Sequence, residues 1–223
     1  MPIASVSEHL RELAITEYAE RHTDHEPEIL TRLTREADER LMYPRMNCGH
    51  LQGRLLRMLV RITGAREVLE LGTYAAYSTH CLAEGLPEGG HLTTIDVNDE
   101  MEPVIHDSLS EASIHEKVTS LIGDAKELLP TLDLSSYDLI YLDADKKGYP
   151  DYYHLIVPVM RPGALLIADN TLWGGKVAQS DSHDPQTMAL RSFNDLVAED
   201  PTVEKVLIPL RDGLTLIYKK DKI

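Results

Sequence analysis

The rhythm of apolar and polar positions along the chain changes near Gly64. Before this glycine, apolar residues recur every three or four positions, which predicts helices that each bury one face. The apolar positions of three expected helices are Leu10, Leu13, Ala14 and Tyr18, then Ile29, Leu33, Ala37 and Leu41, and then Leu51, Leu55, Leu56, Leu59 and Val60. Pro27 suits the first turn of the second helix, and Gly64 suits the end of the third.

Short apolar runs dominate the pattern after Gly64. Seven of them are predicted as strands: Glu67–Leu71, His91–Ile95, Val118–Ile122, Tyr137–Leu142, Ala164–Ala168, Val203–Pro209 and Leu214–Tyr218. Helical patterns separate the first five runs, and they include Ser78–Glu84, Asp99–Glu111 and Tyr149–Met160. This alternation predicts a parallel sheet with helices on both faces. The short link between the last two runs contains Asp212-Gly213, so we expect an antiparallel hairpin there.

The expected fold class is therefore α/β, with a doubly wound, Rossmann-like sheet of seven mostly parallel strands, the last of them antiparallel, and an N-terminal helical extension. A chain of 223 residues suits one domain, in which helices at 1–63 adjoin a sheet-containing part at 64–223 that carries the candidate ligand site. The net charge of −15 discourages non-specific binding to nucleic acid or anionic lipid. Cys48 and Cys81 are expected to be free thiols in a reducing compartment. No apolar stretch approaches the ~20 residues of a membrane span, so we expect a cytoplasmic protein.

Carboxylates and an amide follow two of the predicted strands. Asp143 ends one strand, and Asp169 and Asn170 follow the next. Strand ends of this kind aim side chains into the crevice where open α/β sheets bind ligands. The three side chains form an all-oxygen set, which suits a hard divalent cation such as Mg²⁺ or Ca²⁺. Lys146 lies next to this set in the sequence and is a candidate proton acceptor.

Acidic residues at other strand ends suggest a cationic ligand. Glu70 precedes a turn with the single glycine Gly72, whereas a pyrophosphate cofactor would need the full G-x-G-x-x-G pattern. A negative charge here suits the sulfonium and ammonium groups of S-adenosylmethionine. Asp96 ends the second strand and is a candidate for binding both ribose hydroxyls. Gly123-Asp124-Ala125 follows the third strand and is expected to border the adenine.

With these motifs in place, the chain resembles the cation-dependent O-methyltransferases, the group that contains the caffeoyl-CoA and catechol O-methyltransferases. The similarity runs from about Met46 to Lys219. It rests on Met46…Gly53, Glu70-Leu71-Gly72-Thr73-Tyr74, Tyr77-Ser78, Asp143-Ala144-Asp145-Lys146, Asp169-Asn170-Thr171-Leu172-Trp173-x-Gly175 and Leu210-x-Asp212-Gly213-Leu214-Thr215. The resemblance implies the methyltransferase variant of the doubly wound sheet, and an enzyme that uses S-adenosyl-L-methionine.

The resemblance also implies roles by position. Asp143, Asp169 and Asn170 would bind the cation, with Mg²⁺ as the first choice and Ca²⁺ or Mn²⁺ as alternatives. Lys146 would be the general base, and Asp143 would share the catalytic role. Contacts to S-adenosylmethionine are implied for Met46, Cys48, Glu70, Gly72, Thr73, Ser78, Asp96, Asp124, Ala125 and Asp145. The N-terminal helices would form a lid over the acceptor and the surface of a homodimer.

The chain departs from the family pattern in three places. Ala75-Ala76 replaces the usual Thr-Gly, which removes a glycine from the cofactor turn and is expected to weaken binding. Arg54 replaces the usual Gln after Gly53. Gly174 replaces an Asn of the plant enzymes, which argues against a caffeoyl-CoA-like acceptor although Gly174 stays a candidate substrate contact. Trp173 either lines the acceptor pocket or packs against the core.

The leading hypothesis is metal-dependent O-methylation of a small vicinal diol, that is, a hydroxylated aromatic acceptor resembling catechol. A second hypothesis is methylation of a hydroxyuridine in tRNA, which needs a cationic surface. Arginines that could form one are Arg32, Arg35, Arg40, Arg45, Arg54 and Arg57. A non-catalytic protein that binds S-adenosylmethionine is a third hypothesis, supported only by Ala75-Ala76. A NAD-dependent oxidoreductase is disfavoured because the further glycines are missing.

Overall fold

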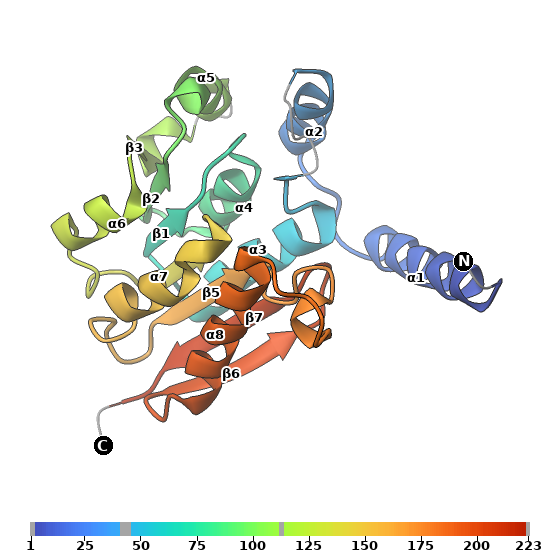
Figure 1. Cartoon of the computed structure of the whole chain (residues 1–223). Coiled ribbons are helices and arrows are strands. Elements are labelled where there is room, and N and C mark those ends of the chain that lie inside the picture. The colour runs from blue at the N-terminus through green and yellow to red at the C-terminus, as the bar shows by residue number, and fades with distance from the viewer. Residues whose placement is uncertain (1–2, 41–45, 112–113, 222–223) are drawn as a thin grey trace.

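The computed structural model describes residues 3–40, 46–111 and 114–221, and for residues 3–9, 12, 40 and 111 it describes only the backbone. Leu41 and Arg45, which entered the sequence-based expectations, lie outside the described residues. A twisted sheet runs through the molecule, and helices flank it on both sides (Figure 1).

The sheet has seven strands in the order β3-β2-β1-β4-β5-β7-β6. Their bounds are β1 Glu67–Leu71, β2 His91–Asp96, β3 Val118–Ile122, β4 Leu139–Leu142, β5 Leu165–Asp169, β6 Val203–Ile208 and β7 Leu214–Lys219. The pairs among β1 to β5 are parallel, and β7 is antiparallel to both β5 and β6. The expected doubly wound sheet with an antiparallel last strand is therefore confirmed. The sequence patterns predict no strand order, and the structure places β7 between β5 and β6.

Eight α-helices are described. Their bounds are α1 Ile3–Arg21, α2 Glu28–Arg40, α3 His50–Thr63, α4 Tyr77–Gly85, α5 Glu102–Glu111, α6 Ala125–Leu128, α7 Tyr149–Ile156 and α8 Pro185–Glu199. The expected helix over Asp99–Glu111 begins with a 3₁₀ turn, η2 (Asp99–Met101). The one expected to reach Met160 ends at Ile156, because Pro158 has no amide hydrogen with which to continue the helix.

Sequence analysis missed α8. Asp184 caps this helix by accepting a hydrogen bond from the Thr187 amide (3.1 Å), and Pro185 occupies its first turn. Its apolar positions Leu190, Phe193 and Val197 are buried. The cap and the spacing of three and four were both visible in the sequence, so the pattern could have been recognised.

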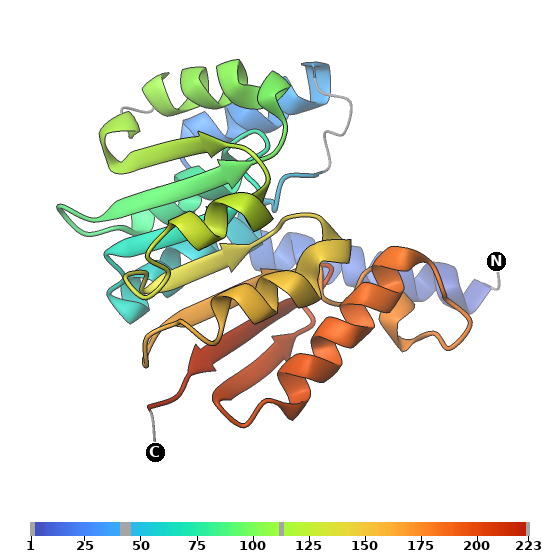
Figure 2. The ribbon, with the colours of Figure 1, turned by 60° about the vertical axis from the view of Figure 1, so that its left-hand side comes forward.

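Alternate residues of each strand face two separate cores. Side chains such as Val68 and Leu139 pack with α2, α3, α4 and α5, whereas Leu69 and Ile140 pack with α7 and α8 on the opposite face. Figure 2 shows the strands stacked in one sheet with α7 and α8 along one side. Because both faces are covered, the strands read as nearly continuous apolar runs.

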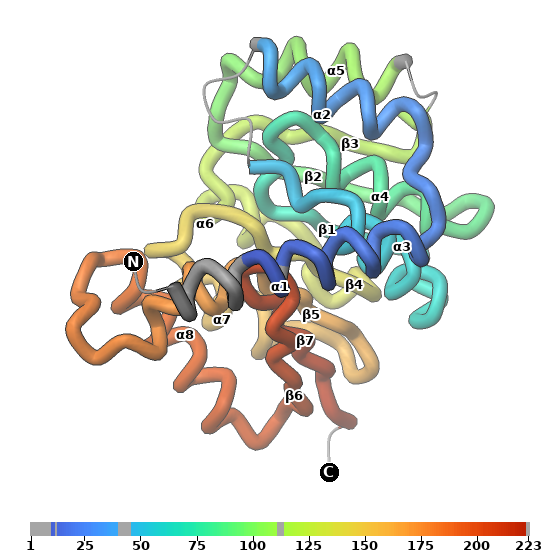
Figure 3. Tube along the Cα trace, turned by 90° about the vertical axis from the view of Figure 1, so that its right-hand side faces the viewer, coloured from blue at the N-terminus to red at the C-terminus, as the bar shows by residue number. Residues whose placement is uncertain are grey.

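The N-terminal helix α1 lies apart from this layered body. It contacts α3 and extends away from the sheet in Figure 1, and Figure 3, turned by 90°, shows it crossing in front of the other elements. Among the described residues, no helix combines the length and the apolar character that crossing a membrane requires.

The turn after β1 contains a strained alanine. Ala76 precedes α4 with a φ of 63°, in the left-handed region, and its side chain is fully buried. Glycine adopts this backbone geometry without steric cost, whereas alanine loses about 1 kcal/mol or more. The chain therefore keeps the left-handed backbone that a glycine would favour at this position, although its side chain opposes it.

Ala76→Gly should raise the free energy of unfolding by about 1 kcal/mol, because it removes the Cβ from a left-handed residue. Urea denaturation measures the change. The matched control is Ala75→Gly, since Ala75 is also buried but has no positive φ. This control should lower the free energy of unfolding by about 0.5–1 kcal/mol. Equal destabilisation by both substitutions would contradict the presence of strain at Ala76.

Candidate functional site

The expected site residues surround one cavity of about 760 Å³ at the carboxyl edge of the parallel strands. The chain order reverses at the neighbouring strands β1 and β4, the place where open α/β sheets bind ligands. The expected residues in its wall are Met46, Cys48, Gly72, Thr73, Ser78, Asp96, Asp124, Ala125, Asp143, Asp145, Lys146, Asp169, Asn170 and Trp173. Glu70 and Gly174 lie outside this wall.

Strand register brings together the two carboxylates that were expected to bind a cation. β4 and β5 are parallel and pair Leu142 with Ala168, so Asp143 and Asp169 are the next residues on adjacent strands. Neighbouring strands lie roughly 4.8 Å apart, which makes these two side chains neighbours. Asn170 follows with a φ of 57°, a left-handed conformation that asparagine tolerates better than most residues. Two carboxylates and one amide therefore converge on the cavity.

Lys146 is held between a carboxylate and a phenol. Its Nζ donates to Asp143 Oδ1 (2.6 Å) and to the Tyr149 hydroxyl (2.9 Å). Two backbone carbonyl oxygens anchor the Tyr149 hydroxyl: that of Asp169 at 2.8 Å and that of Leu142 at 3.0 Å. Burial raises the pKa of Asp143 to about 6. The negative charge of Asp169 also raises this pKa, whereas Lys146 lowers it. Lys146 is thus fixed beside the carboxylate pair and is itself nearly buried.

Asp169 has two partners that sequence analysis missed. Its Oδ2 accepts hydrogen bonds from Gln52 Nε2 (2.5 Å) and from the Tyr141 hydroxyl (2.6 Å). Its Oδ1 accepts one from the backbone N–H of Asn170 (2.7 Å). All three of these side chains, Gln52, Tyr141 and Asp169, are buried. Gln52 shares one face of α3 with the core residues Leu56 and Val60, so a polar residue on that apolar face was the available signal.

Glu70 lies beneath the cofactor turn. Its position in β1 directs it toward α4, where Oε2 accepts hydrogen bonds from Thr79 (2.5 Å) and Thr94 (2.7 Å). The Thr94 hydroxyl lies 2.6 Å from that of Thr73, which does line the cavity. Oε1 is buried without a recorded hydrogen-bond partner among the described residues. Burial raises the pKa of Glu70 to about 7, although hydroxyl groups including that of Ser78 oppose the shift.

Asp96 organises the turn that follows β1. Its Oδ2 accepts hydrogen bonds from the amides of Thr73 (3.0 Å) and Tyr74 (2.7 Å), and Oδ1 accepts one from Asn98 (2.9 Å). A carboxylate oxygen has about two acceptor positions, so Oδ1 keeps one for a ligand while Oδ2 has none to spare. We had expected Asp96 to accept from both ribose hydroxyls, and this geometry leaves capacity for one.

The remaining expected contacts divide between the two ends of the cavity. Asp124 caps α6 through the Lys126 amide (2.8 Å), and Ala125 follows it in the cavity wall. Asp145 is exposed in the wall. Cys48 is buried, and this burial is the main cause that raises the pKa of its thiol well above the ordinary value. The thiol is therefore held in its neutral form beside the cavity.

Trp173 lies between the cavity and the core. It lines the cavity and also packs against the core on the α7–α8 face. Its indole Nε1 is buried and has no recorded acceptor among the described residues. Gly174 is exposed and outside the cavity wall, but its amide donates to Asp212, whose side chain does line the cavity. Gly174 thus bears on the site through Asp212.

The arginines proposed as an RNA-binding patch are largely engaged in ion pairs. Arg54 and Arg57 contact the two oxygens of Glu84 at 2.8 and 2.9 Å, and Arg32 lies 3.8 Å from Glu36. Arg54 is also buried. The described part of this set is therefore partly neutralised, and the structure does not assemble it into a free cationic surface.

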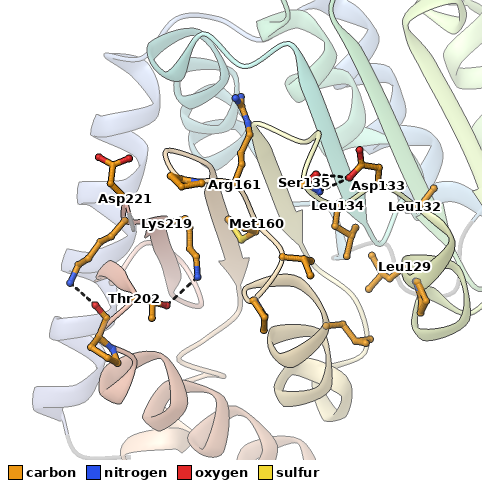
Figure 4. A pocket seen from close by; sticks show the side chains of 17 residues that line it. Leu129, Leu132, Asp133, Leu134, Ser135, Met160, Arg161, Thr202, Lys219 and Asp221 are labelled. Carbon is orange, nitrogen blue, oxygen red and sulfur yellow. Dashed lines mark hydrogen bonds between the residues drawn. The ribbon is translucent and has the colours of Figure 1, made fainter. Parts of the chain in front are cut away.

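A second cavity lies at the opposite edge of the sheet, with a volume of about 970 Å³ (Figure 4). Its wall is mostly leucine, proline and other apolar side chains, and it contains none of the expected site residues. Its cationic side chains are engaged locally, since Lys219 donates to the Thr202 hydroxyl (3.2 Å) and Lys220 to the Pro201 carbonyl (2.9 Å). The chemistry described above is therefore confined to the first cavity.

Comparison with known proteins gives consistent matches. Residues 19–220 match the family model described as O-methyltransferase. A protein of Niastella koreensis named catechol O-methyltransferase is 31% identical over 185 residues, which cover 79% of this chain and 84% of that protein. The O-methyltransferase TomG of Streptomyces achromogenes, solved with S-adenosylmethionine, has a TM-score of 0.86 at 30% identity and covers 93% of this chain and 96% of its own. An O-methyltransferase from Bacillus cereus, solved with S-adenosylhomocysteine, has a TM-score of 0.85 at 27% identity, with coverages of 93% and 97%.

Glu70→Gln should reduce the dependence of stability on pH. Because the pKa of Glu70 rises from 4.5 to about 7 on folding, the folded state binds more protons than the unfolded state between these values. The free energy of unfolding of the wild type therefore falls as pH rises through this window. From about pH 5 to about pH 7.5, we expect the free energy of unfolding of Glu70→Gln to fall by about 1–3 kcal/mol less than that of the wild type.

Urea titrations at the two pH values, without added ligand, measure this difference. Glu199→Gln is the matched control, because Glu199 is an exposed carboxylate at the end of α8. It should follow the wild type at both pH values. If the free energy of unfolding fell equally in Glu70→Gln and in the wild type, a raised pKa at Glu70 would be contradicted.

Proposed function

Because the chain belongs to the O-methyltransferase family, we propose that it transfers the methyl group of S-adenosylmethionine to a hydroxyl of a small catechol-like molecule with the help of a divalent cation. The observation that carries this proposal is that Asp143, Asp169, Asn170 and Lys146 line one cavity. Asp96 at a strand end and the glycine turn, which suit the methyl donor, line the same cavity.

The turn after β1 fits the proposed donor. A Cβ atom on Gly72 would lie 2.1 Å from the carbonyl oxygen of Asp143, so only glycine allows β1 and β4 to approach so closely. Asp96 keeps one acceptor position for a ribose hydroxyl, and Glu70 lies buried beneath the turn, where its Oε2 accepts hydrogen bonds from Thr79 and Thr94. Relatives solved with S-adenosylmethionine and S-adenosylhomocysteine support the same choice of donor.

The donor atoms at the other end suit a hard divalent cation. Asp143, Asp169 and Asn170 would hold it, and two carboxylates with one amide leave positions for water and substrate, as Mg²⁺ prefers; Ca²⁺ and Mn²⁺ are alternatives. Within the described residues, no group of three or more His, Cys, Asp or Glu is arranged to hold a metal, so the amide is needed to complete the set. The cation would supply positive charge that orients a vicinal diol and stabilises the developing oxyanion.

Lys146 is the proposed general base. Tyr149 and Asp143 fix its Nζ beside the carboxylates, where the amine, once its ammonium form has released a proton to solvent, would accept the proton of the acceptor hydroxyl. The new bond joins that oxygen to the methyl carbon as the carbon–sulfur bond breaks, and S-adenosylhomocysteine leaves. Gln52 and Tyr141 hold Asp169 in one orientation, so the acceptor meets a rigid set of groups.

A small acceptor fits these features better than tRNA does. The cavity is bounded by Trp173 and Met46, whose apolar surfaces suit an aromatic ring. A relative named catechol O-methyltransferase supports the same class of acceptor. The pairing of Arg54 and Arg57 with Glu84 removes much of the positive charge that an RNA backbone would need.

We further propose that a second copy of the chain covers α1. This helix is separated from the sheet, and four of its apolar side chains leave about half or more of their surface exposed: Leu10, Leu13, Ile15 and Tyr18. Exposed apolar surface of this kind is typical of association sites. By contrast, α2 and α3 contribute Leu30 and Leu56 to the same core as the sheet. This shared core supports treating residues 1–63 as part of the catalytic domain.

Asp169→Ala should abolish nearly all turnover while S-adenosylmethionine still binds, because the substitution removes a proposed cation ligand and leaves the glycine turn intact. An assay with labelled S-adenosylmethionine, excess Mg²⁺ and acceptors that include catechol, caffeic acid derivatives, flavonoids and tRNA measures turnover. Calorimetry measures donor binding. Asp181→Ala, at an exposed position, is the control and should keep wild-type turnover. Full activity in Asp169→Ala, or in wild type with chelator, would remove the cation from the mechanism.

The proposed association predicts a molar mass near twice the 25.0 kDa of one chain. Light scattering after size exclusion measures it. Replacing Leu10 and Leu13 together by Glu should yield a monomer, because charged side chains oppose burial of the helix. Met188→Glu is the control, since it alters an exposed apolar residue on α8, and it should leave the mass unchanged. A wild-type monomer would contradict the proposal.

A further inference from the structure

Arg211 brings an unpaired positive charge to the acceptor end of the cavity. It lies in the turn between β6 and β7 with a φ of 49°, and its side chain lines the cavity wall. Nη1 donates to the carbonyl oxygen of Asn47 (3.1 Å), which belongs to the segment leading into α3. One hydrogen bond thus fixes the position of the guanidinium, which has five N–H donors in all.

The other cations in the cavity wall are already paired with carboxylates. Lys146 lies 2.6 Å from Asp143, and Lys126 lies 2.5 Å from Asp151. For Arg211, no carboxylate lies within 4.0 Å among the residues that the structure describes. Its remaining donors are therefore available to a ligand.

The charge of Arg211 acts on the proposed reaction site. It lowers the pKa of Asp143 and of Asp212, in both cases against the dominant effect of burial. Asp212 follows Arg211 directly and bonds the Gly174 amide, beside the loop that carries Trp173. The guanidinium is thus within electrostatic range of the place where the acceptor would bind.

We propose that Arg211 selects acceptors that carry a carboxylate, so that the substrate class is an anionic catechol rather than a neutral one. This inference rests on the proposed function, because it assumes that the acceptor lies beside Asp143 and Lys146. A planar guanidinium matches a carboxylate with two parallel hydrogen bonds, and its charge is permanent. One N–H held by Asn47 keeps the group oriented before the ligand arrives, which lowers the entropic cost of recognition.

Two other roles for Arg211 make different predictions. If it only ties the β6–β7 turn to Asn47, its loss would affect neutral and anionic acceptors equally. If it binds the carboxylate of S-adenosylmethionine, its loss would raise the KM of the donor and leave acceptor preference unchanged. The experiment therefore compares acceptors that differ only in charge.

The test compares 3,4-dihydroxybenzoate with its neutral methyl ester as acceptors. In Arg211→Gln, we expect the ratio of kcat/KM for the acid to kcat/KM for the ester to fall about three- to tenfold, because Arg211 is exposed and solvent weakens its interaction. Because each acceptor is compared between the wild type and the variant, the difference in intrinsic reactivity between the acid and the ester cancels. Arg211→Lys keeps the charge but loses the paired donors, so its ratio should lie between those of the wild type and Arg211→Gln.

Lys147→Gln is the matched control. It also removes one positive charge near Asp143, but Lys147 is exposed and lies outside the cavity wall. Its ratio should stay within about twofold of the wild type, because exposed charges at longer range are screened. An unchanged ratio in Arg211→Gln, an equal loss for both acceptors, or a rise only in the donor KM would each overturn the proposal.

A binding measurement separates this proposal from the proposed function. Calorimetry with S-adenosylhomocysteine and Mg²⁺ gives the Kd of the acid and of the ester for the wild type and Arg211→Gln. If the wild type methylates neither acceptor, the catechol function is wrong, and the Kd ratio still decides whether Arg211 recognises the carboxylate. If the wild type methylates the ester but neither ratio depends on Arg211, only the present inference is wrong.

Discussion

The close approach of β1 and β4 at their carboxyl ends is the constraint on which the site depends. Gly72 has a φ of 99°, and a Cβ atom there would lie 2.1 Å from the Asp143 carbonyl oxygen. Any side chain would force the two strands apart at the point where the chain order of the sheet reverses. The absence of a side chain therefore allows the turn proposed to hold the donor and the first cation ligand to share one cavity.

Neighbouring carboxylates under partial burial repel each other, and the surrounding donors hold them in place. Lys146 offsets Asp143 with a full charge, while Gln52 and Tyr141 give Asp169 two neutral hydrogen bonds. Such donors limit the free-energy cost of burying a charge, and they also fix the direction of each carboxylate. The raised pKa of Asp143 shows that the compensation is incomplete. A site with residual negative charge is suited to attract a cation.

The N-terminal helices complete a site that the sheet alone leaves open. Gln52 of α3 reaches Asp169 across 117 positions of sequence, and Asn47 in the preceding segment anchors Arg211 across 164. Met46 and Cys48 form part of the same cavity wall. The helical extension therefore supplies contacts both to Asp169 and to Arg211.

The class of fold and most of the cavity wall could be predicted from the sequence, because short apolar runs and helical patterns locate the elements and show where each strand ends. Carboxyl ends of parallel strands share one edge, so Asp96, Asp143 and Asp169 could be assigned to one site. Only the tertiary structure decided which side chains meet across the faces of the sheet. Gln52 and Tyr141 lie 89 positions apart, Glu70 turned beneath α4 rather than into the cavity, and β7 inserted between β5 and β6. Local patterns give the face that a residue occupies, whereas its partner on that face depends on how distant segments pack.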